Sequence, residues 1–199
     1  MMMPIDEKHP LVLASASPRR TKLLARMGIP HRVVVSRVDE NGRIESPEAF
    51  CRNLARLKAK DVGSREDVSW ILGADTIVVI GSKVLGKPVN HEDAQKMLSL
   101  LSGKDHQVIT GFCVLNPSGV VAHAESVTTT VRFKPLSEEE ITGYIGTREP
   151  FGKAGAYAIQ GVGAFMVESI SGSYTNVVGL PMCALIKGLV QCGALRSFP

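Results

Sequence analysis

The sequence predicts an α/β fold in which helices flank a mixed β-sheet. Stretches with strand character alternate with stretches of helical periodicity along the chain, which is typical of this class. Among them are pairs of strand-like stretches joined by short turns, which predict antiparallel hairpins and therefore a sheet that is not purely parallel. The apolar run Trp70–Ile80 is too short for a buried helix and predicts a central strand covered on both faces.

Length and composition are those of a compact globular protein. The chain has 199 residues, which is enough for one domain or for two lobes that share a core. Its 44% hydrophobic and 21% charged residues argue against disorder beyond the ends. The formal net charge of +4 permits an anionic ligand, but no block of Lys and Arg marks a nucleic-acid-binding tail. With only 5% aromatic residues a base-stacking surface is not indicated either, and we expect no nucleic-acid partner.

The four cysteines do not form a recognisable metal or disulfide pattern. None belongs to a C-x-x-C pair, and no His lies at zinc-finger spacing from them. Cys51 and Cys183 fall in predicted helices and are most simply buried core thiols. Residues 1–10 are polar, and no apolar run of about 18 residues occurs, so we expect neither a signal peptide nor a membrane span. These features together favour a reducing cytoplasm as the location.

The elements of the N-terminal part follow from helix-start and strand signals. Ser followed by Pro marks the start of a helix, because Ser caps the helix end and Pro fits the first helical position. This signal occurs twice before residue 50, and Gly28 ends the first of the two helices. In order, we expect a strand at Leu11–Ala14, a helix capped by Ser17, a strand at Arg32–Val35, a turn at Asn41-Gly42, a helix capped by Ser46, and the strand Trp70–Ile80.

The helix after Ser46 carries one residue that does not fit its pattern. Phe50, Leu54 and Leu57 share one helical face, which predicts the buried side of the helix. Lys58 falls inside the same apolar arc. Two interpretations are open. Either its aliphatic stem covers the border of the apolar face while the ammonium reaches solvent, or the ammonium points into a cleft.

The C-terminal part combines hairpins with three further helices. Capping residues mark the helix starts, most clearly the capping box formed by Ser137 and Glu140. The last helix is expected to turn Leu185, Ile186, Leu189 and Val190 toward the core. In order, we expect a hairpin arm at Val84–Pro88, a helix from Asn90 to Gly103, strands at Gln107–Leu115 and Val120–Phe133, a helix through Tyr144, an ordered loop at Thr147–Gly163, a strand at Phe165–Ile170 and a helix from Pro181.

Residues 15–20 form a candidate anion-binding site. A strand that ends at Ser15 and a helix that starts after Ser17 bring main-chain N–H groups and the positive end of the helix dipole to one place. Arg19 and Arg20 in the first helical turn oppose that dipole, which favours an anion nearby, and we expect both guanidinium groups at the rim of the site. A solvent-exposed pair of arginines is the simpler alternative. The combination with two hydroxyl groups favours a phosphate, although the sequence has no Walker or G-x-G-x-x-G motif.

Asp75 places a carboxylate in the middle of the central strand. An unpaired buried carboxylate costs on the order of several kcal/mol, so something must satisfy Asp75 or the strand must open onto a cleft there. A single Asp of this kind is more simply structural. Glu40 also follows an apolar strand, however, and Lys58 and Lys87 supply cations. Two carboxylates with several cations suit metal-assisted attack on a polyphosphate, although a surface salt-bridge network would have the same composition.

Eight short motifs occur in the order in which they are found in the Maf family of nucleoside triphosphate pyrophosphatases, which the chain resembles from Leu11 to about Leu189. The resemblance implies an elongated, twisted mixed sheet in two lobes with a central cleft. It also implies hydrolysis of a nucleoside triphosphate between the α and β phosphates. The motifs are Ser15–Arg20, Val38–Glu40, Leu57–Ala59, Gly73–Thr76, Leu85–Pro88, Leu101–Gly103 with His106, Lys153–Gln160 and Gly172–Pro181.

The resemblance also implies roles for individual residues. Asp75 matches the proton acceptor of the family and Glu40 its second acidic residue, and both are expected ligands of Mg²⁺ or Mn²⁺. A Gln such as Gln160 can donate to a pyrimidine carbonyl and accept from N3–H, which agrees with the dTTP/UTP branch of the family. The remaining expected site residues are the phosphate-handling cations Arg20, Lys58 and Lys87, the substrate contacts Ser15, Ser17 and Lys153, and the substrate-sorting positions Arg19, Thr76 and Gln160.

The expected function is therefore the removal of surplus or non-standard pyrimidine triphosphates. We expect residues 1–10 to be an N-terminal extension and residues 11–199 a single catalytic domain, and the family suggests a homodimer. Two alternatives stay open: a nucleotide-binding regulatory protein linked to septum formation, and a pyrophosphatase of another branch that acts on modified purine nucleotides. Turnover of a panel of triphosphates distinguishes the three.

Overall fold

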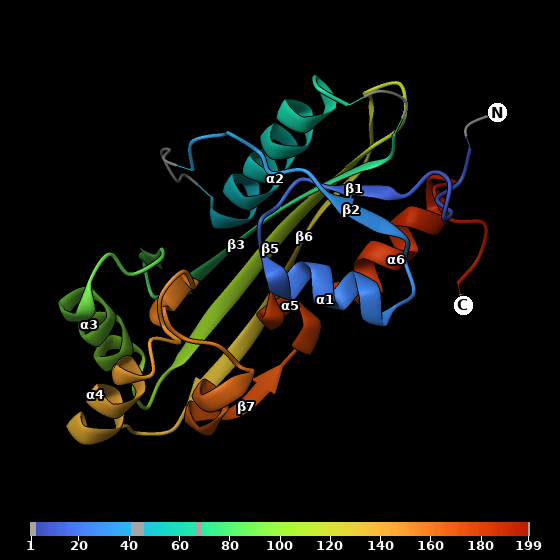
Figure 1. The fold of residues 1–199 in the computed structure, drawn as a ribbon. Coiled ribbons are helices and arrows are strands. Elements are labelled where there is room, and N and C mark those ends of the chain that lie inside the picture. Colours follow the sequence, from blue (N-terminus) through green and yellow to red (C-terminus); the bar gives the residue numbers. More distant parts are fainter. Residues whose placement is uncertain (1–2, 41–45, 67–68, 199) are drawn as a thin grey trace. The chain divides into compact units, whose positions relative to one another are not determined.

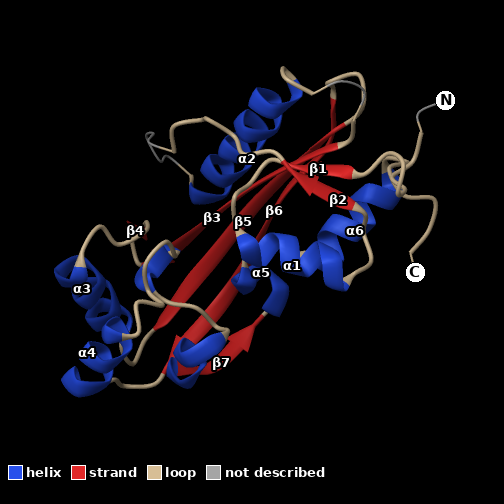
Figure 2. Ribbon diagram, in the orientation of Figure 1, coloured by secondary structure: helices blue, strands red, loops and turns tan. Residues whose placement is uncertain are grey.

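The computed structural model describes residues 3–40, 46–66 and 69–198, and the turn predicted at Asn41-Gly42 lies outside them. In this part of the chain seven strands form one mixed sheet in the order β2-β1-β3-β5-β6-β7, with β4 paired to β3 (Figures 1 and 2). The predicted α/β class with a mixed sheet is thus confirmed. The strands are β1 (Leu11–Leu13), β2 (His31–Val33), β3 (Ile71–Ile80), β4 (Lys83–Leu85), β5 (Asp105–Leu115), β6 (Val121–Phe133) and β7 (Val167–Ser171).

Strand direction agrees with a mixed sheet. β1 pairs in parallel with both β2 and β3, whereas β3–β4 and β6–β7 are antiparallel pairs. The helices are α1 (Pro18–Arg26), α2 (Pro47–Gly63), α3 (His91–Leu101), α4 (Glu138–Gly146), α5 (Tyr174–Val178) and α6 (Met182–Gln191), with 3₁₀ turns η1 (Ala154–Ala156) and η2 (Gly161–Met166).

The chain divides into two compact units. Unit 1 comprises residues 1–75, 110–127 and 179–199, and unit 2 comprises residues 76–109 and 128–178. The two predicted lobes correspond to these units, while the cleft stays a prediction. The N-terminal extension packs on unit 1. Ile5 is buried and donates its main-chain N–H to the carbonyl of Ala194 at 2.8 Å, and the Trp70 indole N–H donates to the carbonyl of Met3 at 2.8 Å.

Helix α2 approaches the sheet of unit 1 unusually closely, because two strand positions opposite it are glycines. A Cβ atom at Gly73 of β3 would lie 2.9 Å from the main-chain nitrogen of Ala59 and closer still to the carbonyl of Ala55. A Cβ atom at Gly111 of β5 would lie 2.6 Å from the carbonyl of Cys51. Glycine inside a strand commonly marks such a close approach of another backbone. In Figure 1, α2 lies on one side of the strands of unit 1 and α1 and α6 lie on the other.

Three predicted burial assignments are wrong. Leu57 is 45% exposed although it was expected on the buried face of α2, because small residues such as Ala55 and Ala59 make the contact with the sheet. Cys183 is exposed and not a core thiol, whereas Cys51 is buried as predicted. Val190 at the end of α6 is exposed as well.

Unit 2 has its own core, formed by aromatic and aliphatic side chains around Phe133, Tyr144 and Tyr157. The predicted capping box of α4 is present, with Ser137 and Glu140 each accepting a main-chain N–H bond from the other. The loop predicted between residues 147 and 163 is ordered and contains η1 and the start of η2. Helix α5 was not predicted, because its five residues are too few to show a helical period.

Candidate active site

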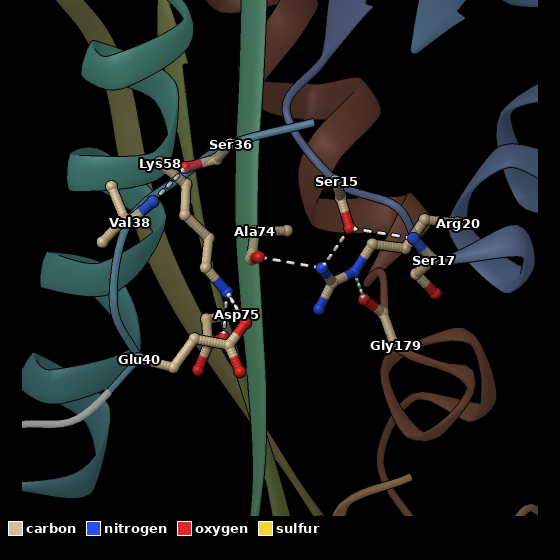
Figure 3. A network of polar contacts seen from close by, with 10 residues as sticks. All are labelled: Ser15, Ser17, Arg20, Ser36, Val38, Glu40, Lys58, Ala74, Asp75 and Gly179. Atoms are coloured by element: carbon tan, nitrogen blue, oxygen red, sulfur yellow. Dashed lines mark hydrogen bonds and ion pairs between the residues drawn. The ribbon is translucent and has the colours of Figure 1, made fainter. Parts of the chain in front are cut away.

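Asp75 lies in β3 of unit 1 and is almost completely buried, with 7% of its surface exposed. Its carboxylate does not rely on main-chain N–H groups alone. The Oδ1 atom accepts a hydrogen bond from the Lys58 ammonium at 2.6 Å (Figure 3). The attraction between the two charges offsets part of the desolvation penalty that an isolated buried carboxylate would carry. The charge in the apolar strand therefore has a specific partner.

Lys58 decides between the two interpretations left open by the helical pattern. Its side chain extends from α2 with 6% of the residue exposed, so it does not reach out to solvent. The ammonium donates to Oε1 of Glu40 at 2.7 Å and to Oδ1 of Asp75 at 2.6 Å. One cation thus lies between two carboxylates, and the absence of a side chain at Gly73 permits the short distance from α2 to β3 at which Lys58 contacts Asp75.

Glu40 gives this cluster its opening to water. Its side chain is 46% exposed, against 10% for the side chain of Asp75. The segment that carries it is fixed upstream: the main-chain N–H of Arg37 donates to Asp61 Oδ2 of α2 at 2.9 Å, and that of Val38 donates to Ser36 Oγ at 3.2 Å. Lys58, Glu40 and Asp75 carry a combined charge of −1 when all three are ionised, which suits a cationic or cation-bound ligand.

Arg20 is buried and not at the rim of the site, which corrects the expectation from its place in the first turn of α1. Its Nε donates to the carbonyl of Gly179 at 2.8 Å, and its Nη1 donates to Ser15 Oγ and to the carbonyl of Ala74, each at 2.8 Å (Figure 3). Burial lowers the pKa of Arg20, and the nearby carboxylate of Asp75 opposes that shift. Arg20 thus ties the end of β1 to the residue before Asp75.

The predicted anion site lies at the start of α1, where the helix begins as expected but without the side-chain capping bond. Ser17 occupies the N-cap position in extended conformation, yet its side chain makes no capping hydrogen bond. Its main-chain N–H donates instead to Ser15 Oγ at 3.3 Å. The first turn of α1 contains no acidic residue, and Arg19 in that turn is half-buried. The helix end therefore keeps the electropositive character that an anion site needs.

The structure brings five predicted site residues together in unit 1: Ser15, Arg20, Glu40, Lys58 and Asp75. Four others belong to unit 2. Among them Lys153 donates through its ammonium to the main-chain carbonyl of Glu149, and Gln160 precedes η2 as its N-cap. Thr76 and Gln160 are half-buried, and Lys87 is exposed just after β4.

Comparison with known proteins decides the family. The profile described as "Maf-like protein" matches residues 10–192. The chain belongs to the Maf family. It is 51% identical over 198 residues to the dTTP/UTP pyrophosphatase of Syntrophotalea carbinolica, covering 98% of this chain and 90% of that protein. It is 50% identical over 190 residues to the dTTP/UTP pyrophosphatase of Geobacter sulfurreducens, covering 95% of this chain and all of that protein (100%).

Among solved structures, the Staphylococcus aureus Ham1 protein overlaps with part of the fold of this Maf-family chain. The TM-score is 0.44 at 15% sequence identity, and the match covers 62% of this chain and 71% of that one.

Two groups that shape the site in this Maf-family chain were missed from the sequence, because both act through the main chain. The carbonyls of Ala74 and Gly179 accept hydrogen bonds from Arg20 and so fix the position next to Asp75. A carbonyl carries no sequence signal of its own. Gly73 did carry one, since a glycine inside an apolar strand indicates close backbone packing.

The donor set of the cluster fits a hard divalent cation. Glu40 and Asp75 offer carboxylate oxygens, the ligands that Mg²⁺ and Mn²⁺ prefer, and Mg²⁺ sites commonly use only one or two carboxylates together with substrate phosphates. Within residues 3–40, 46–66 and 69–198 no group of three or more His, Cys, Asp or Glu side chains is placed to hold a metal by itself.

Among the helices formed by residues 3–40, 46–66 and 69–198, none is both long and apolar enough to cross a membrane.

Proposed function

We propose that this protein hydrolyses dTTP and UTP to the nucleoside monophosphate and pyrophosphate. The observation that carries the proposal is the buried cluster of Asp75, Lys58 and Glu40, in a chain about half identical to relatives named dTTP/UTP pyrophosphatase. An acid, a cation and a second acid in contact suit water activation next to a charged phosphate. Nucleotide-pool cleaning is the corresponding biological role.

Asp75 is the proposed general base. Lys58 orients its carboxylate through Oδ1, which leaves the other carboxylate oxygen to accept a proton from the attacking water. The water oxygen then bonds to the α-phosphorus, the bond from that phosphorus to the bridging oxygen breaks, and pyrophosphate leaves with the electron pair. A positioned base of this kind contributes roughly 10²- to 10⁴-fold to the rate.

Cations stabilise the negative charge that grows on the leaving pyrophosphate. We propose that Lys87, Arg19, Ser17 and the N-terminus of α1 contact the phosphates. Arg20 contributes differently from the expectation, because its guanidinium is buried and holds Ser15 and Ala74 in place. We assign it a positioning role together with a long-range electrostatic one.

A divalent cation, Mg²⁺ or Mn²⁺, is the proposed cofactor, with Glu40 and Asp75 as its protein ligands. When bound, it would neutralise part of the triphosphate charge and polarise the phosphoryl group. The support is the oxygen donor set and the half-exposed carboxylate of Glu40.

Arg19, Thr76 and Gln160 are proposed to select the base, in accordance with the family resemblance. The side-chain amide of Gln160 can donate to a pyrimidine carbonyl and accept from N3–H at once, whereas cytosine and adenine present the reversed order of donor and acceptor. A homodimer and a cytoplasmic location are proposed as well, and both rest on the resemblance and the cysteine pattern.

The first test is turnover of dTTP, UTP, CTP, ATP, GTP and modified purine triphosphates at one concentration, with Mg²⁺ or Mn²⁺. We expect hydrolysis of dTTP and UTP, and a fall of about 10³-fold or more in kcat for Asp75→Asn. Asp105→Asn, the same change at an exposed carboxylate of β5, is the control and should leave kcat unaltered. Equal turnover by the wild type and Asp75→Asn would exclude Asp75 as the base. Tight binding of a nucleotide with no turnover would favour a regulatory protein instead.

A further inference from the structure

Residues 158–163 of unit 2 wrap around one carboxylate, that of Glu149. Its Oε1 accepts hydrogen bonds from the main-chain N–H of Gly163 at 2.9 Å and from the Tyr144 hydroxyl at 3.0 Å. Its Oε2 accepts from the main-chain N–H of Val162 at 3.1 Å. The Tyr144 oxygen in turn accepts from the main-chain N–H of Ala158 at 3.2 Å. Tyr144 and Glu149 together form what we call the loop clamp.

The loop clamp fits so tightly that two positions of the segment must be glycine. A Cβ atom at Gly161 would overlap with Oε2 of Glu149, and the residue has a φ of +75°. A Cβ atom at Gly163 would lie 2.5 Å from the carbonyl of Ala158 and 2.6 Å from the Tyr144 hydroxyl. Tyr144 itself is held in place by the core of unit 2, where only 2% of its surface is exposed.

Gln160 lies between the points at which the clamp holds the main chain. Ala158 is bound on one side of it, and Val162 and Gly163 are bound on the other. Gln160 has an extended backbone, with φ −103° and ψ 157°, at the start of η2. One bound amide lies two residues before Gln160 and another lies two residues after it, which leaves the backbone little room to change direction. The clamp therefore sets where the side chain of Gln160 begins.

The surrounding loop contains backbone conformations that are unusual for residues other than glycine. In the described part of the chain, the non-glycine residues with positive φ are Arg148 (61°) and Ala156 (59°), and both lie in this loop. Conformations of this kind persist only where the surroundings fix them, and they are common near functional sites. Burial raises the pKa of Glu149, but the bonds from Gly163, Val162 and Tyr144 outweigh it, and the net shift of that pKa is downward.

We propose that Tyr144 and Glu149 are positioning residues for base recognition: their hydrogen bonds to residues 158–163 place Gln160 for its contact with the pyrimidine. The inference rests on the proposed function, because it assigns Gln160 to the base of the nucleotide. It goes further in naming two residues outside the proposed contact set that determine specificity. Neither needs to touch the substrate.

The test compares Glu149→Gln, Tyr144→Phe and Gln160→Ala in full-length protein. kcat and KM are measured for UTP and CTP. Tyr144→Phe removes one hydroxyl and keeps the ring, so it is the milder probe of the same clamp. Glu138→Gln, an exposed carboxylate in the first turn of α4, is the matched control. Thermal unfolding of each variant identifies any that fails to fold, and Tyr144→Phe then decides the outcome in place of Glu149→Gln.

The clamp predicts a specific pattern. Glu149→Gln and Tyr144→Phe raise KM for UTP about tenfold, the effect of about one hydrogen bond, with kcat within about threefold of the wild type. The preference for UTP over CTP falls by a similar factor. In the Gln160→Ala background the same changes have little further effect, because residues that act through one another are not additive.

The other outcomes contradict either the role of the loop clamp or the proposed function. Suppose that the wild type hydrolyses UTP and that the preference for UTP over CTP is lost in Gln160→Ala but kept in both clamp variants. This result overturns the role of the clamp and leaves the proposed function intact. A preference unchanged in Gln160→Ala also overturns it. Wild-type protein that hydrolyses neither UTP nor dTTP refutes the proposed function, and the clamp's role with it.

Discussion

Asp75 in unit 1 is buried and Glu149 in unit 2 is half-buried, and the two carboxylates are satisfied by different kinds of donor. Asp75 is held by the ammonium of Lys58, a side chain that also contacts Glu40. Glu149 is held by the main-chain N–H groups of Val162 and Gly163 and by the hydroxyl of Tyr144. The first arrangement leaves a carboxylate oxygen for chemistry, whereas the second commits both oxygens to structure. The kind of donor therefore distinguishes the proposed catalytic carboxylate from one that main-chain hydrogen bonds hold in place.

The strongest way to break this comparison is to remove the cation. We expect Lys58→Met to leave the buried Asp75 without its partner, which costs about 3 to 5 kcal/mol in the free energy of unfolding. Catalysis should be lost as well. Urea unfolding and kcat for dTTP measure the two effects. Lys60→Met, two residues along on the exposed side of α2, is the control, and equal stability of the two variants would show that the Lys58 pair contributes nothing.

A pH titration of stability tests the other unit. Burial in the core of unit 2 lowers the pKa of His106 from 6.5 to about 4. Its Nε2 shares a hydrogen bond with the Tyr157 hydroxyl at 2.8 Å, and in the described part of the chain its Nδ1 has no hydrogen-bond partner. The folded state thus keeps His106 neutral, while the unfolded state binds a proton below pH 6.5.

This difference makes the protein less stable in acid. The contribution of neutral His106 is complete above pH 6.5 and is lost progressively as the pH falls toward 4, by roughly 3 kcal/mol in all. The free energy of unfolding, measured with urea between pH 4.5 and 7.5, should change less steeply with pH for His106→Gln than for the wild type. His91→Gln, at an exposed histidine at the start of α3, should keep the wild-type slope, and parallel curves for all three would contradict the assignment.

The smallest effect is expected where the clamp meets the main chain. Gly161→Ala combines an unfavourable positive φ with a methyl group against Glu149 and should lower the free energy of unfolding by about 1 to 2 kcal/mol. KM for UTP should rise more than kcat falls. Gly119→Ala, also at positive φ but with nothing within 4 Å of the added methyl group, separates the steric term from the conformational one.

Local signals predicted most of the fold. The Ser-Pro starts of α1 and α2, the capping box of α4 and the apolar run of β3 all correspond to elements at nearly the expected bounds. These features depend on neighbours in sequence. Burial was less predictable: Leu54 of α2 is buried as expected, but Leu57 is exposed, and the small residues Ala55 and Ala59 pack on the sheet instead.

The site was predicted in its residues but not in its contacts. Helical periodicity placed Lys58 within the apolar arc of α2, but it left open whether the ammonium reaches solvent or points inward, and it did not show the two carboxylates that bind it. The predicted position of Arg20 at the rim of the site was wrong. The main-chain carbonyls that accept its hydrogen bonds, those of Ala74 and Gly179, lie 54 and 159 residues away in the sequence. Partners at such separations are set by the whole fold, and no local pattern carries them.

Gly73 has a further consequence for how this protein tolerates change. Because a Cβ atom there would collide with the backbone of α2, any other residue would push the helix outward and lengthen the path from Lys58 to Asp75. The absence of a side chain at position 73 thus determines how close Lys58 can come to Asp75. Even Gly73→Ala would therefore move the Lys58 ammonium away from its two carboxylates, although every charged residue of the cluster would still be present.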